Sequence, residues 1–144
     1  DPIANWETYT NVAFRFSFKY PGNQMEPCYS DSDHKATSFY EPSLNCNLKF
    51  DSSTLLEVFI YDPEKLVIET IELGKPVSSK KLQLSGREFT IDEYAPSYKK
   101  TGEKVIIAKT RLSEKTVLEL NFSLNQVLKK VTVDQILSTF RFIE

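Results

Sequence analysis

The stretch FRFSFKYPGN, at positions 14–23, constrains the fold more than any other part of this sequence. Aromatic residues occupy every second position in it, and polar residues separate them; the aromatic residues are Phe14, Phe16, Phe18 and Tyr20. Successive side chains of a β-strand point to opposite faces, so this spacing predicts a strand with one aromatic face. Pro21-Gly22 then ends the strand. We expect the three phenylalanines to be buried beneath a helix and not to form a binding surface.

Period-two alternation continues along much of the chain. Both faces of the segment 53–62 are apolar, which indicates a central strand covered on two sides. The segment 80–95 contains two short strands about a Ser85-Gly86 turn, and the segment 103–124 contains a longer hairpin. Because strand follows strand with short connections, we expect a largely antiparallel sheet of about six strands.

Two segments carry helix signals instead. The segment 62–74 begins with Asp-Pro, which suits an N-cap and a first helical position, and it ends with glycine; its β-branched residues also fit a strand. The segment 132–142 begins with a capping-box pattern formed by Thr132 and Gln135. The sequence therefore predicts an α+β domain in which helices flank the sheet. We expect the polar region 21–47 to be irregular.

Length and charge limit the class of protein further. The 144 residues contain no repeat and no linker, so they suit one domain that spans 1–144. Eighteen basic and 20 acidic residues are scattered and leave a net charge of −2, which argues against nucleic acid as a partner. No apolar run approaches the roughly 20 residues that cross a bilayer, so we expect no transmembrane segment.

Two cysteines, Cys28 and Cys46, would close a loop of about 19 residues. We expect a disulfide between them, because both lie in polar, loop-like sequence and no third cysteine competes; the alternative is two buried thiols in a cytosolic protein. The chain begins at Asp1 without a methionine, which fits a chain whose targeting segment has been removed. We therefore expect an extracytoplasmic protein, either secreted or held at the cell envelope by a lipid anchor upstream of Asp1.

Both ends of the sequence carry patterns of a known family. NWETYTNVAFRFSFKYPGN, at 5–23, is similar to a W-x-x-Y-x-N lead-in followed by a GFSFKYP-type strand. DQILSTFRFIE, at 134–144, is similar to an ILSTFKF-type closing helix. In these features the chain resembles the PsbP-like family of small exported bacterial proteins, named for the extrinsic P subunit of photosystem II. It departs from the pattern at Ala13, where glycine is usual, and at Gly22-Asn23, where the family often continues with Ser-Asp-Trp.

The resemblance carries expectations about fold and function. It implies an antiparallel sheet sandwiched by helices, in agreement with the α+β class above. It also implies a non-catalytic accessory or binding protein, often of the cell envelope. The shared motifs are packing motifs, so they identify neither a partner nor a site.

One segment has the composition of a metal site. SDSDHKATS holds the only histidine, His34, together with Asp31 and Asp33. Carboxylates and imidazole are metal ligands, so a small-ligand or metal-binding module that uses the 28–46 loop is one alternative function. The segment lacks the acidic spacing and the turn glycine of an EF-hand, and a solvated loop would have the same composition.

Signals for catalysis are absent from the sequence. The four glycines are isolated, so there is no glycine-rich phosphate loop, and there is no Gly-x-Ser-x-Gly elbow. We therefore expect no catalytic residue, no cofactor and no enzyme activity. A hydrolase with a dispersed site is the remaining alternative, because the members of a catalytic triad can lie far apart in sequence.

A surface for recognition is the class of site that remains. In the segment APSYKKTGEK, at 95–104, Tyr98, Lys99 and Lys100 lie at a predicted hairpin tip, where they could contact an anionic or polymeric partner. A solubilising loop has the same composition. The sequence thus favours a non-enzymatic, exported accessory domain that binds a protein or an envelope component.

Overall fold

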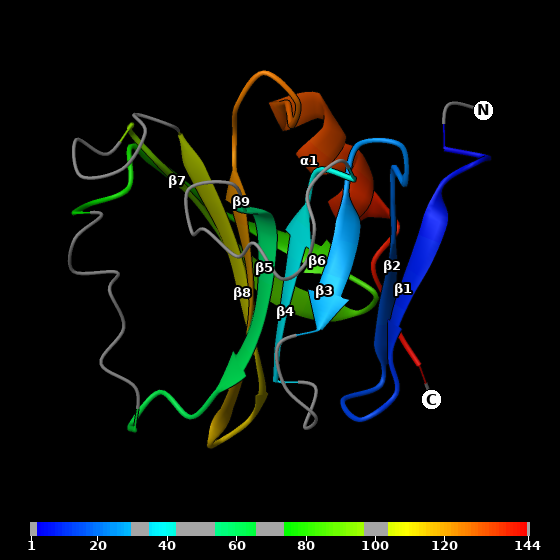
Figure 1. The fold of residues 1–144 in the computed structure, drawn as a ribbon. Helices are drawn as coiled ribbons and strands as arrows, with labels where there is room; N and C mark the ends of the chain where they lie inside the picture. The colour runs from blue at the N-terminus through cyan, green and yellow to red at the C-terminus, as the bar shows by residue number, and fades with distance from the viewer. Residues whose placement is uncertain (1–2, 30–34, 43–53, 66–73, 97–103, 144) are drawn as a thin grey trace.

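The computed structural model describes residues 3–29, 35–42, 54–65, 74–96 and 104–143. These residues form ten β-strands and one α-helix (Figure 1). The strands are β1 (Glu7–Asn11), β2 (Phe16–Tyr20), β3 (Glu26–Tyr29), β4 (Ala36–Tyr40), β5 (Thr54–Tyr61), β6 (Ser78–Leu84), β7 (Arg87–Tyr94), β8 (Val105–Ser113), β9 (Thr116–Ser123) and β10 (Arg141–Phe142). The helix α1 spans Lys130–Ser138.

The strands belong to two antiparallel sheets. The small sheet has the order β1-β2-β10, and the large sheet has the order β3-β4-β5-β9-β8-β7-β6. Among the described residues 55% lie in strands and only 8% in the helix, so the fold is mostly β. The prediction of an α+β domain with about six strands flanked by helices is therefore wrong. It failed because short polar strands, such as β3 and β4 in the region expected to be irregular, carry no clear alternation.

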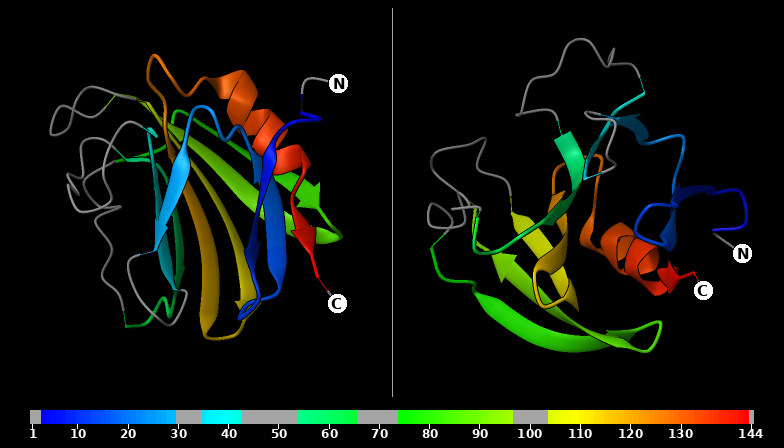
Figure 2. Two further views of the ribbon diagram at one scale, coloured as in Figure 1. Left: turned by 45° about the vertical axis from the view of Figure 1, so that its right-hand side comes forward. Right: turned by 90° about the horizontal axis from the view of Figure 1, so that it is seen from below.

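The large sheet is strongly curved, and α1 lies on its concave side (Figure 2). Seen from below, the small sheet stands next to the helix at the open side of this curve. Side chains of both sheets and of α1 share one hydrophobic core. The largest side chains in it are Phe16, Phe18, Phe39, Phe89, Phe122 and Phe140, all less than 2% exposed.

The aromatic strand at 14–20 is a core strand, as its period predicted. Phe16 and Phe18 on β2 are buried, at 0% and 1% exposed. The ring of Phe16 stacks on that of Phe140, just after α1, with 5.5 Å between centroids. Phe14 is an exception, because the strand begins two residues later; Phe14 lies in the turn after β1 and is only partly buried.

A buried polar chain joins the small sheet to the large one. The Tyr9 hydroxyl on β1 lies 3.2 Å from the Thr37 hydroxyl on β4. The Asn11 side-chain N–H donates to the Tyr9 hydroxyl. The side-chain oxygen of Asn11 accepts the backbone N–H of Phe14 at 3.0 Å. Tyr9 and Asn11 are the tyrosine and asparagine of the W-x-x-Y-x-N pattern, so that pattern serves packing between the sheets.

The C-terminal helix was predicted at 132–142 and is found slightly earlier. The capping-box prediction is wrong: the N-cap is Lys129, which makes no side-chain cap, and Thr132 lies inside the first turn. Before the helix, the Asn125 carboxamide oxygen accepts two backbone N–H groups at 2.7 and 2.8 Å and fixes the turn. The expected end of the helix is instead β10, which pairs with β2.

The two predicted hairpins are confirmed. Ser85 and Gly86 both have positive φ, 52° and 80°, as a type I′ turn between β6 and β7 requires. β8 and β9 form the longer hairpin. Of the other predicted helix, 62–74, the part at 66–73 lies outside the described residues. At its start, the Asp62 side chain accepts the backbone N–H of Glu64 in a turn.

Candidate functional site

Nearly all the site residues predicted from sequence lie outside the described residues. They are Asp31, Asp33 and His34 for the metal site, Tyr98, Lys99 and Lys100 for the partner surface, and Cys46 of the disulfide. Cys28 is described: it lies on β3 and is 4% exposed. Within the described part of the chain, no three His, Cys, Asp or Glu side chains gather in a way that could hold a metal ion. The metal site, the partner surface and the Cys28–Cys46 disulfide thus stay predictions.

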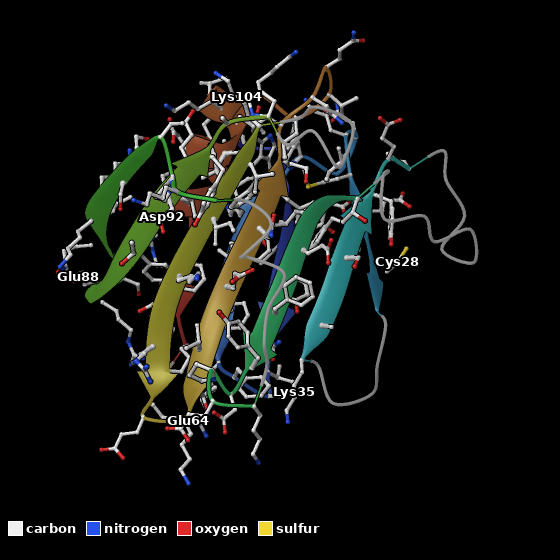
Figure 3. The ribbon with its side chains drawn as sticks, turned by 90° about the vertical axis from the view of Figure 1, so that its left-hand side faces the viewer. Cys28, Lys35, Glu64, Glu88, Asp92 and Lys104 are labelled. Atoms are coloured by element: carbon white, nitrogen blue, oxygen red, sulfur yellow. The ribbon has the colours of Figure 1, made fainter. Side chains whose placement is uncertain are left out.

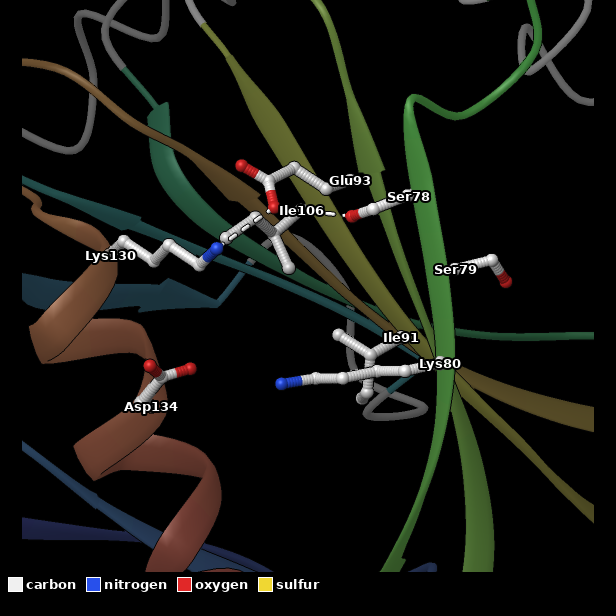
Figure 4. Close-up of a pocket in the computed structure, with 8 residues that line it drawn as sticks. All are labelled: Ser78, Ser79, Lys80, Ile91, Glu93, Ile106, Lys130 and Asp134. Atoms are coloured by element: carbon white, nitrogen blue, oxygen red, sulfur yellow. Dashed lines mark hydrogen bonds and ion pairs between the residues drawn. The ribbon is translucent and has the colours of Figure 1, made fainter.

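The described residues do form a pocket between α1 and the β6–β7 hairpin (Figure 4). Its volume is about 110 Å³. We call it the α1–β6 pocket; it is lined by Ser78, Ser79, Lys80, Ile91, Glu93, Ile106, Lys130 and Asp134. Ser78 and Lys80 alternate along β6 and point toward the helix, as Ile91 and Glu93 do on β7 (Figure 4).

An ion pair closes one side of the α1–β6 pocket. The Lys130 ammonium donates to the Glu93 carboxylate at 3.0 Å, and the Ser78 hydroxyl donates to the same oxygen at 3.4 Å. The hydrogen bond from Lys130 holds the pKa of Glu93 below its usual value, so Glu93 is anionic at neutral pH. The Lys80 ammonium extends across the pocket toward α1, on the side where Asp134 lies (Figure 4).

The pocket suits a side chain better than a substrate. Sites for small molecules usually enclose roughly 300–1,000 Å³, several times the volume found here. Its floor is apolar, with Ile91 and Ile106, and its rim carries two ammonium and two carboxylate groups. Such a surface can receive one side chain of a protein partner and orient it by charge.

No sequence signal pointed to this pocket. The ion pair joins residues 37 positions apart, and the pocket residues are distributed over three strands and a helix. Lys80 stands next to Lys81 in the sequence, and such a pair does not by itself indicate a pocket. Asp134 was visible only as an acidic residue in a predicted first helical turn.

A buried carboxylate occupies the opposite, convex face of the large sheet, the face seen in Figure 3. Glu119 on β9 lies between Leu118 and Leu120, which enter the core, so its side chain points away from the core. It is nevertheless only 2% exposed. The Tyr61 hydroxyl donates to its Oε1 at 3.1 Å, and the Lys109 ammonium lies 4.0 Å from the same oxygen.

Burial dominates the ionisation of this group. Desolvation raises the pKa of Glu119 above its usual value, although Lys109 and the hydrogen bond from Tyr61 oppose the shift. The pKa of Tyr61 is raised as well, by burial and by the adjacent carboxylate. Deprotonation of Glu119 therefore costs more free energy in the folded protein than in the unfolded chain.

As pH rises, the Glu119→Gln variant is expected to become more stable to unfolding relative to the wild type. Because the folded pKa is raised, the stabilisation from the protonated carboxyl is full below the unfolded pKa of about 4.3 and is lost as pH rises through the folded pKa. A glutamine side chain does not titrate, so its contribution to stability is constant over this range. Urea unfolding between about pH 4 and pH 8 measures the difference in free energy of unfolding between variant and wild type.

The control for this experiment is Glu114→Gln in the exposed β8–β9 turn, which removes one negative charge from the chain without removing a buried one. If the free energy of unfolding of the wild type instead rises relative to that of Glu119→Gln as pH rises, then the interactions of the carboxylate with Lys109 and Tyr61 outweigh its desolvation.

Comparison with solved structures identifies the architecture. The solution structure of cyanobacterial PsbP (CyanoP) from Synechocystis sp. PCC 6803 is similar with a TM-score of 0.60 over 97% of this chain and 94% of that one. The fold is PsbP-like. A crystal structure from Bacteroides thetaiotaomicron VPI-5482 is similar with a TM-score of 0.59 over 96% of this chain. The match covers 48% of the Bacteroides protein, so this chain spans about half the length of that protein.

The likeness is one of fold. Sequence identity is 14% to CyanoP and 11% to the Bacteroides protein. No family model matches the chain, and no curated protein matches it. The sequence resemblance to PsbP-like proteins is thus confirmed as a shared fold.

Both motifs that carried the resemblance lie in the core of this PsbP-like fold. Tyr9 and Phe16 from the N-terminal motif are buried, as are Ile136, Leu137 and Phe140 from the C-terminal one. In the portion of the chain that the structure describes, no helix has the length and apolar character needed to cross a membrane.

Proposed function

We propose that this chain is a non-enzymatic accessory domain that acts outside the cytoplasm by binding a protein of the cell envelope. The observation that carries the proposal is the PsbP-like fold, which extends over nearly the whole of this chain and of CyanoP. The PsbP-like family that the sequence resembles consists largely of extrinsic accessory proteins without catalytic activity. An extracytoplasmic location also agrees with the predicted disulfide between Cys28 and Cys46.

The described surface supports binding of a protein more than turnover of a substrate. The α1–β6 pocket is small, and two of the four charged groups on its rim, Glu93 and Lys130, form an ion pair. The buried carboxylate Glu119 is engaged by Tyr61 and Lys109. A pocket of this size beside exposed strand residues fits the side chain of a docked protein.

Fractionation combined with crosslinking tests the proposal. The full-length chain, tagged and expressed in its native host, is expected in the extracytoplasmic fraction and is expected to crosslink to one envelope protein at constant stoichiometry. An unrelated tagged domain sent through the same export route serves as the control and should not capture that protein. Recovery in the cytosol without a crosslinked partner would overturn the proposal. Binding heat on titration with calcium, zinc or manganese would favour the metal-binding alternative instead.

A further inference from the structure

The free edge of β6 is the most exposed strand edge of the large sheet. β6 is the last strand in the order of that sheet, and β7 is its pairing partner. Its seven residues make it the longest edge strand among those described, and the first six are exposed. At the other edge, β3 has four residues and contains Pro27, a residue that hinders further pairing.

The register shows which backbone groups of β6 point outward. Leu84 and Arg87 flank the two-residue turn and so form a hydrogen-bonded pair; in an antiparallel ladder such pairs recur at every second residue. Leu82, Lys80 and Ser78 therefore bond to β7. Gln83, Lys81 and Ser79 direct their N–H and C=O groups away from it. No backbone hydrogen bond to these three edge residues is formed by another described residue outside the β6–β7 ladder.

The charge on β6 selects the kind of strand that can pair with it. β6 contains Lys80 and Lys81, on opposite faces, and no acidic residue. Lys80 forms no ion pair with another described residue, and the pair between Lys81 and Glu88 is exposed and long, at 3.6 Å, so it contributes little. An incoming strand with carboxylates opposite these lysines would gain attraction on both faces.

A second copy of this chain does not fit the edge. Antiparallel pairing of β6 with β6 would place lysines against lysines, and like charges directly opposite each other destabilise a ladder. Lysine on an edge strand is a common protection against such self-pairing. An acidic segment from another protein would not be repelled by these lysines.

We propose that β6 takes up an extended acidic segment of a protein partner as an additional strand of the large sheet. This inference rests on the proposed function, because it names how the partner binds. Main-chain hydrogen bonds to Ser79, Lys81 and Gln83 supply affinity, and carboxylates beside Lys80 and Lys81 supply specificity. Apolar side chains on the same segment contact the exposed Leu82 and enter the neighbouring α1–β6 pocket.

A peptide in which pairs of glutamates alternate with pairs of valines, so that both faces of the strand carry carboxylates, is the probe; it is long enough to cover β6. Binding is measured by fluorescence anisotropy at low salt, and amide hydrogen exchange locates it. We expect the amides of Ser79, Lys81 and Gln83 to become protected when the peptide binds. A lysine–valine peptide of the same length should not bind. Binding of the acidic peptide without protection of these three amides would overturn the inference.

Two variants separate backbone pairing from charge. Lys81→Pro removes an outward N–H and one ammonium without removing a bond to β7. It is expected to abolish binding, a larger loss than reversal of both lysine charges gives, because the backbone can no longer pair. The double variant Lys80→Glu/Lys81→Glu is expected to weaken binding by about tenfold through like-charge repulsion. Lys115→Glu, an equal type of charge change in the exposed β8–β9 turn, is the matched control and should bind as the wild type does. Circular dichroism verifies that each variant is folded.

The same variants distinguish failure of this inference from failure of the proposed function. If Lys81→Pro and the double variant still crosslink to the envelope partner in cells, the domain binds a protein but not through β6. Sedimentation that shows dimers of the wild type, dissociated by Lys81→Pro, would also overturn the inference in favour of self-pairing.

Discussion

Replacing Phe16 with alanine is expected to lower the free energy of unfolding by about 3–5 kcal/mol. Phe16 is fully buried on β2 and stacks on Phe140 with their ring planes 16° apart. Phe140 in turn contacts the edge of Phe89 on β7 at 5.1 Å between centroids. Phe16 thus belongs to a cluster of aromatic rings that joins the small sheet to the large one.

The cost should lie toward the upper part of this range because the cavity cannot collapse easily. β1 and β10 hold β2 on both sides, and hydrogen bonds within the large sheet hold β7. A cavity between two rigid sheets keeps most of its volume, and the residual volume adds to the loss of transfer free energy.

Chemical denaturation followed by circular dichroism measures the effect. Phe14→Ala is the matched control, because Phe14 precedes the strand and is only partly buried; its cost should be clearly smaller. Val12→Ala, at a residue 73% exposed, should change stability by less than about 0.5 kcal/mol. If Phe16→Ala costs no more than Phe14→Ala, the aromatic strand does not carry the core.

Reduction of the protein is expected to lower the free energy of unfolding by about 3 kcal/mol, if Cys28 and Cys46 are joined. A crosslink over a loop of about 19 residues restricts the unfolded chain, and its loss restores that entropy. Cys28 is buried on β3, at an edge of the large sheet, so the crosslink would tie a short edge strand to a later part of the chain.

Thiol titration and denaturation with and without reductant measure this effect. Protein purified without reductant should show no reactive thiol under denaturing conditions. The double variant Cys28→Ala/Cys46→Ala should be insensitive to reductant, which controls for effects of the reductant itself. Two reactive thiols in the unreduced wild type would remove both the disulfide and its support for an extracytoplasmic location.

Strands with strong local signals could be predicted from sequence, and strands defined by distant partners could not. The β6–β7 hairpin was predictable because alternation and the Ser85-Gly86 turn agree with each other. β4, with the sequence ATSFY, has weak alternation and depends on pairing with β3 and β5. β10 has two residues, and its strand conformation comes from β2 alone. The two sheets could not be foreseen because a ladder between distant segments leaves no local pattern.

The candidate site was less predictable than the fold. Lys130 and Glu93 meet only because α1 packs across the concave side of the large sheet. Alternation in the sequence puts Glu119 on the face of β9 opposite Leu118 and Leu120, but it does not indicate that Glu119 is buried there. Alternation gives the face on which a side chain lies; the burial of that face depends on the rest of the chain.

The pairing of β10 with β2 sets the order in which the protein can be completed. Arg141 and Phe142 pair with Ser17 and Phe16, and a hydrogen bond joins Lys19 to Thr139, 120 positions later. Ribosomes add about 5–20 residues per second, so roughly 6–25 s pass between synthesis of β2 and synthesis of the C-terminal residues that pair with it. During that interval the edge of β2 opposite β1 is unpaired, and Phe16 lacks the ring of Phe140 that covers it in the folded protein. Exposed apolar surface and an unpaired strand edge promote association between incomplete chains, so the C-terminal segment removes this hazard when it pairs with β2.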